Sequence, residues 1–126
     1  CETAHYLAAK GKRVTVVEML KRMAQDMGPM VRRRLMDGLK TNRVSLMTET
    51  KAEEILENEV TVATPEGRRT TLPADTVILA AGYRSDDRLA KALEGKVPEV
   101  RIIGDAFQPR GIMEAVRDGY LAALGL

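Results

Sequence analysis

Two carboxylates, each placed after a short apolar run, are the side chains of this sequence best suited to binding a ligand. Glu18 closes the run that begins at Arg13, and Asp105 follows Gly104 and the run 100–103. Carboxylates accept hydrogen bonds from sugar hydroxyls, and α/β sheets bind ligands at the carboxyl ends of their strands. Because an acidic residue at a strand end is often only solvated surface, each needs support from its neighbours.

The position of Glu18 favours a nucleotide. In a dinucleotide-binding βαβ unit, the acid that binds the adenosine ribose stands ~20 residues beyond a glycine-rich phosphate loop. Counting back from Glu18 puts that loop before Cys1, so we expect the first strand and the loop to be missing from this sequence. A carboxylate here repels a 2′-phosphate and favours NADH over NADPH, although Lys21 and Arg22 close by could compensate. Met19, next to Glu18, completes this group of expected cofactor contacts.

The second group lies near the end of the sequence. Gly104 and Asp105 precede an expected helix that begins near Gly111, and Ile112 and Met113 would form its first turn. Amides at a helix start can face an anion or an electron-rich ring edge. Two small residues further along that helix, Ala115 and Gly119, would let it approach a sheet closely, and ordinary packing explains them equally well.

The elements that must position these residues alternate between helices and strands. Helical spacing predicts helices at 2–10, ended by Gly11, at about 26–42, at 87–93 and at 111–124. Continuous apolar runs predict buried strands at 13–18, 44–47, 75–81 and 100–103. The short segments 52–56, 59–64 and 68–72 predict a small antiparallel meander.

This order predicts an α/β fold: a Rossmann-like, three-layer parallel sheet with a small antiparallel β-meander, its first strand and glycine-rich loop truncated. We expect two domains, a nucleotide-binding domain over residues 1–83 and the end of a second domain over 84–126. In the helix at 26–42, Val31, Leu35 and Leu39 lie four residues apart and should face the core.

Composition limits the alternatives. With 126 residues, 44% apolar, the chain can bury a core, and 3% aromatic residues with no Trp make that core aliphatic. The net charge of +2 is small and its residues are interspersed, so we expect neither a nucleic-acid nor a membrane partner. The single cysteine excludes an internal disulfide or a zinc pattern, so we expect no metal site and a cytoplasmic location.

Three blocks together resemble the two-dinucleotide-fold flavoproteins, and in particular the C-terminal half of NADH:flavin oxidoreductases of the 2,4-dienoyl-CoA reductase and enoate reductase type. The blocks are Cys1-Glu-Thr-Ala with Val14-Thr-Val-Val-Glu18, then Asp75-Thr-Val-Ile-Leu-Ala-Ala-Gly82, then Ile103-Gly-Asp-Ala-Phe-Gln-Pro-Arg-Gly-Ile-Met-Glu-Ala-Val-Arg-Asp-Gly-Tyr120. The resemblance covers essentially the whole chain, and the order and spacing of the blocks are specific.

The resemblance implies a role for each block. Glu18 is similar to the acid that binds the NADH ribose, and Ala81-Gly82 to a backbone turn against the nicotinamide nucleotide where the two domains join. Asp105 is similar to the carboxylate that holds the ribityl or pyrophosphate region of FAD, and Ile112 and Met113 to the start of a helix that faces the flavin. No residue of this chain is expected to be catalytic itself.

In such enzymes NADH passes hydride to FAD, and electrons travel through an iron–sulfur cluster to FMN in a separate barrel domain that reduces an activated C=C bond. The resemblance therefore implies an enzymatic parent protein with NADH and FAD in this region, and FMN and the cluster outside this chain. A small-molecule substrate would bind to domains that are missing here. The resemblance allows a homo-oligomer but does not require one. We expect the piece alone to bind NADH poorly, to hold FAD hardly at all and to be inactive.

Other readings remain. A non-catalytic, ADP-holding structural module would use the same fold without turnover. The lone His5 and Cys1 are better explained by packing than by acid–base or redox chemistry. The run Arg32-Arg-Arg34 could meet nucleic acid, but three bases on an amphipathic helix are more often its solvated face.

Overall fold

A computed structural model describes residues 1–125 and shows a mixed α/β chain with a parallel and an antiparallel sheet. The chain divides into two compact units, Cys1–Ile78 and Leu79–Leu126, which are described separately below. The predicted domain boundary between residues 83 and 84 stays a prediction. No helix among the described residues is long and apolar enough to cross a membrane.

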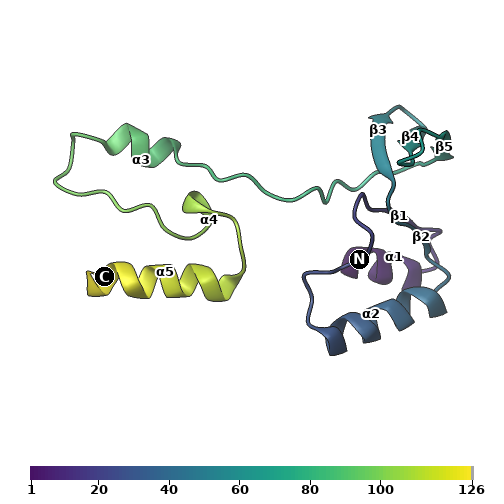
Figure 1. Cartoon of the computed structure of the whole chain (residues 1–126), viewed down its shortest axis with the longest axis horizontal. Helices are drawn as coiled ribbons and strands as arrows, with labels where there is room; N and C mark the ends of the chain where they lie inside the picture. Colours follow the sequence, from purple (N-terminus) through teal and green to yellow (C-terminus); the bar gives the residue numbers. More distant parts are fainter. Residues whose placement is uncertain (126) are drawn as a thin grey trace. The chain divides into compact units, whose positions relative to one another are not determined.

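The first unit opens with two helices and two strands in alternation (Figure 1): α1 (Glu2–Ala9), β1 (Thr15–Val17), α2 (Pro29–Thr41) and β2 (Ser45–Met47). All four were predicted. Gly11 allows the chain to leave α1, since its φ of 81° is strained for other residues, and Pro29 starts α2 because the first helical turn needs no N–H there. Strands β1 and β2 pair in parallel, with Val16 opposite Leu46.

A small aliphatic core joins these elements. Leu39 of α2 is fully buried, and it packs with Leu35 of the same helix and with Ala4 of α1. Val16 of β1 is partly buried against this cluster, so both helices pack beside the parallel pair. Val31 is 59% exposed, so the prediction that it faces the core was wrong: only Leu35 and Leu39, on the later turns of α2, are buried.

The rest of the first unit is the predicted antiparallel meander: β3 (Lys51–Ile55), β4 (Glu59–Ala63) and β5 (Arg69–Pro73). The central strand alternates: Val60 is 8% exposed and Val62 is fully buried, while Thr61 between them is only partly buried. The period-two pattern in the sequence therefore reports one buried face, as expected for a small antiparallel sheet.

The second unit contains α3 (Arg88–Leu93), the short α4 (Gly104–Phe107) and α5 (Ile112–Leu124). Helices α3 and α5 confirm the predicted helices at 87–93 and 111–124. The predicted strands at 75–81 and 100–103 were wrong, since neither run pairs with another strand. Gly104 and Asp105 begin the short helix α4, which was not predicted.

Missing pairing explains both errors. A strand exists only where its backbone groups meet a partner strand, and the described residues provide none beside either run. Leu79, in a run expected to be buried on both faces, is 77% exposed as a result. The strand β1 has a parallel partner on one side only, and it is likewise only partly buried.

Candidate functional site

Glu18 lies directly after β1, at the carboxyl end of the parallel pair, as predicted. Its amide donates to the carbonyl of Met47 over 2.8 Å, and its own carbonyl accepts from the amide of Thr50 over 3.0 Å. These bonds fix the backbone on the side of β2. The side chain is half-buried, and its Oε1 accepts the amide of Leu20 over 3.0 Å. A carboxylate has about four acceptor positions, so Glu18 retains capacity for ribose hydroxyls.

The loop after Glu18 is held by a residue that sequence reasoning did not assign to the site. Arg32 of α2 donates from Nε to the carbonyl of Met23 over 2.8 Å, and Met23 is only 3% exposed. Arg32 is half-buried, whereas Arg33 and Arg34 are exposed. The interpretation of all three arginines as a solvated face was therefore wrong for Arg32. Met19, in the same loop, is 67% exposed.

In the second unit, the predicted flavin-side residues lie on α4 and at the start of α5. Asp105 is exposed and its Oδ1 accepts the amide of Arg110 over 3.4 Å. Ile112 and Met113 form the first turn of α5, where backbone amides have no partner within the helix, and both side chains are exposed. The structure therefore brings Asp105 and the start of α5 together through one short loop.

Gly104 sits against α5. Its φ of 56° belongs to the left-handed region, and a Cβ placed on it would lie 3.4 Å from the Cβ of Ala115. A Cβ on Gly119 would lie 3.9 Å from Cδ1 of Ile103. Ala115 and Gly119 thus permit close approach as expected, although they meet α4 and an extended segment rather than a sheet.

Asp118 of α5 connects this loop to the helix, and sequence reasoning missed it. Its Oδ2 accepts the amide of Gly104 over 3.1 Å and also pairs with the guanidinium of Arg110. The sequence does contain a signal: Asp118 stands about two helical turns beyond Gly111 and therefore shares the face on which the loop arrives.

Ala81 and Gly82 lie in extended chain between the last strand and α3. Gly82 has a φ of 90°, and a Cβ placed on it would meet no atom within 4 Å. The left-handed backbone of Gly82 fits the predicted turn. The role of both residues against a nucleotide stays a prediction.

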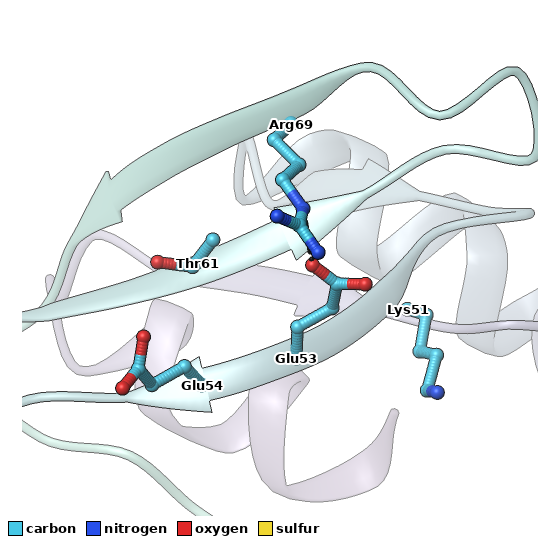
Figure 2. Close-up of a pocket in the computed structure, with 5 residues that line it drawn as sticks. All are labelled: Lys51, Glu53, Glu54, Thr61 and Arg69. Atoms are coloured by element: carbon cyan, nitrogen blue, oxygen red, sulfur yellow. Dashed lines mark ion pairs between the residues drawn. The ribbon is translucent and has the colours of Figure 1, made fainter.

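A shallow hollow on the meander holds none of the predicted residues. Figure 2 shows Arg69 of β5 reaching over β4 to Glu53 of β3, with Lys51, Glu54 and Thr61 around them. The Arg69 Nε lies 2.8 Å from Glu53 Oε2, and the Arg69 side chain is 72% exposed. An exposed ion pair of this kind contributes little to the stability of the fold, and it gives no reason to place a ligand in this hollow. Among residues 1–125 no group of ligand side chains is arranged to hold a metal ion.

Comparison with known proteins agrees with this arrangement. The family model described as pyridine nucleotide-disulphide oxidoreductase matches residues 1–113. The chain is 42% identical over 113 residues to a metal reductase of Desulforamulus reducens, covering 90% of this chain and 17% of that protein. It is 41% identical over 124 residues to an NADH oxidase of Thermoanaerobacter brockii, covering 98% and 19%.

A solved structure is similar over the same length. The complex of 2-naphthoyl-CoA reductase with 2-naphthoyl-CoA matches with a TM-score of 0.85 and 34% identity, covering 98% of this chain and 19% of that one. The chain therefore spans less than a fifth of the length of each of these proteins.

Proposed function

The chain belongs to the pyridine nucleotide-disulphide oxidoreductase family, and from this premise we propose that it helps a flavoprotein to take hydride from NADH onto FAD. The oxidoreductase class follows from the family. The choice of NADH, the residues that bind it and the onward path of the electrons are our proposals.

The observation that carries the proposal is the position of Glu18. Its half-buried carboxylate closes a parallel strand whose backbone is fixed by Met47 and Thr50, and one oxygen already accepts the amide of Leu20. A carboxylate held this way accepts ribose hydroxyls and repels a 2′-phosphate. The nearby Lys21 and Arg22 are exposed and make no ion pair within the described chain, so they stay available to a 2′-phosphate, and the proposal for NADH rests on the charge of Glu18 itself.

The second unit supplies the residues for FAD in this proposal. Asp105 would accept hydroxyls of the ribityl or pyrophosphate region, and the first-turn amides of Ile112 and Met113 would face the electron-rich edge of the ring. FAD, when bound, provides the hydride acceptor. The protein residues bind and orient the two cofactors and do no covalent chemistry themselves.

The direct test is anaerobic reduction of the full-length protein. We expect visible flavin absorbance that NADH bleaches, and that an equal concentration of NADPH bleaches more slowly. A flavin that neither nucleotide reduces, or a protein without flavin, would contradict the proposal. A colourless protein that binds ADP would instead support the structural-module alternative.

We further propose that the electrons leave through an iron–sulfur cluster and FMN outside this chain and reduce an activated C=C bond. The similarity to 2-naphthoyl-CoA reductase supports an acyl-thioester substrate, whereas the relative named a metal reductase points to a different acceptor. Anaerobic NADH oxidation with α,β-unsaturated acyl thioesters, and separately with ferric complexes, distinguishes them. Turnover with ferric complexes alone would overturn the C=C proposal and leave the NADH–FAD step standing.

A further inference from the structure

We propose that Asp118 is a positioning residue: it holds the segment 104–111, which consists of α4 and the loop after it, on α5 so that Asp105 keeps one orientation toward FAD. This inference rests on the proposed function, because it assumes that the loop meets a flavin. It assigns a task to a side chain that makes no direct cofactor contact in the proposed site.

The geometry forms a relay of three residues. Asp118 Oδ2 pairs with the guanidinium of Arg110, and the backbone amide of the same Arg110 donates to Asp105 Oδ1 over 3.4 Å. Asp118 Oδ2 also accepts the amide of Gly104, the residue directly before Asp105, over 3.1 Å. Asp105 is thus fixed from both sides along the chain by one carboxylate on α5.

Burial separates this pair from the other ion pairs of the second unit. The side chains of Arg110 and Asp118 are 32% and 20% exposed, whereas those of Arg88 and Asp86 are 88% and 56% exposed. Partial removal from water strengthens charge-assisted hydrogen bonds, while exposed pairs are screened by solvent. The charge-assisted hydrogen bonds of Asp118 are therefore stronger than those of an exposed ion pair.

The backbone of the loop is shaped for this contact. Gly104 adopts a positive φ of 56°, and a Cβ placed on it would lie 3.4 Å from the Cβ of Ala115, so the small Ala115 permits this close approach. Both features let the Gly104 amide reach Asp118. Because that amide is used by Asp118, the groups left to meet a ligand are the remaining acceptor positions of Asp105 and the first amides of α5.

The first experiment compares Asp118→Asn with Asp86→Asn in the full-length, flavin-containing protein. The asparagine keeps the size and one acceptor but loses the charge that pairs with Arg110. We expect about tenfold weaker FAD binding and a changed visible circular dichroism of the bound flavin, with NADH affinity unchanged. Asp86→Asn removes an aspartate of the same unit that pairs with a neighbouring arginine but has no link to the loop, and should leave FAD binding unchanged.

A second experiment separates positioning from general stability. If Asp118 acts through Asp105, then Asp118→Asn should weaken FAD binding far less in an Asp105→Asn background than in the unsubstituted protein. Arg110→Gln, which spares the Asp118–Gly104 bond, should repeat the effect of Asp118→Asn and serves if that variant does not fold. Equal losses in both backgrounds, or a lowered Tm with unchanged FAD affinity and dichroism, would overturn the inference alone. An unsubstituted protein without flavin would overturn the inference and the proposed function together.

Discussion

At the scale of single residues, sequence reasoning could identify the site residues whose proposed role follows from their place at the end of a predicted strand. Glu18 could be found because it ends an apolar run, and Asp105 because it follows one. Their hydrogen bonds to Thr50 and Arg110 could not be found this way, since both partners lie in loops whose course depends on tertiary contacts.

Glu18→Gln tests the nucleotide contact without disturbing the loop, because the glutamine oxygen can still accept the Leu20 amide. Hydrogen bonds that involve a charged group contribute about 1.5–3 kcal/mol, so NADH binding should weaken by about tenfold or more. NADPH binding should weaken less, because a repulsive charge is removed. Titration of the full-length protein with both nucleotides measures this, and the exposed Glu57→Gln is the matched control. An unchanged ratio of the two affinities would refute the assigned contact.

Asp86 provides a pH-dependent prediction in the second unit. The hydrogen bond from the Arg88 side chain, and then the one from the Arg88 amide, hold the pKa of Asp86 below its ordinary value. A lowered folded-state pKa means that any stabilisation is present above the ordinary pKa and is lost as the pH falls through the folded-state value. An NMR titration should show Asp86 ionising at lower pH than in Arg88→Gln. Lys91→Ala, which breaks the neighbouring pair with Asp87, should leave the Asp86 titration unchanged.

The residues that sequence reasoning missed are those that act through other residues. Arg32 and Asp118 stand on amphipathic helices where charged side chains are normally solvated, and only the arrival of a loop gives each a partner. Spacing placed Asp118 on the correct face of α5, but the sequence contains no signal for the path of the loop itself.

At the scale of elements, local patterns predicted every helix except α4, together with β1, β2 and the meander, because their local sequence patterns are complete in themselves. Gly11 and Pro29 mark helix ends by their own backbone preferences. The runs 75–81 and 100–103 carry an equally good strand pattern, yet neither forms a strand. A strand needs a partner strand, and the pattern of one segment does not show whether a partner is present.

Helix packing gives a prediction at Gly38 of α2. A Cβ there would lie 2.7 Å from Nε2 of His5 on α1, which is closer than side chains tolerate. Alanine is the better helix former by about 1 kcal/mol, so Gly38→Ala should stabilise an His5→Ala variant by roughly that amount. In the unsubstituted chain the displaced imidazole should cancel most of this gain. Urea unfolding of the four chains measures the coupling, and the same effect of Gly38→Ala in both backgrounds would disprove the contact.

At the scale of the whole molecule, the two units differ in how much they bury. Leu39 and Val62 are fully buried in the first unit, whereas no described residue from Leu79 onward is buried. Hydrogen exchange on the 126-residue chain should therefore show protected amides in α2 and β4 and rapid exchange in α5. Comparable protection in α5 would mean that the second unit is stabilised by contacts that this structure lacks.

The same difference in burial predicts how tightly the 126-residue chain binds NADH and FAD. Ile112 and Met113, which should face the flavin, are 83% and 77% exposed, and the loop is fixed mainly by Asp118. A ligand that binds an incompletely packed unit must also compensate for the entropy lost in ordering it. We expect NADH affinity weaker than micromolar, from Glu18 acting alone, and almost no FAD binding. Fluorescence titration of this chain and of the full-length protein measures the difference, and micromolar NADH affinity in the short chain would show that Glu18 and its loop suffice for binding.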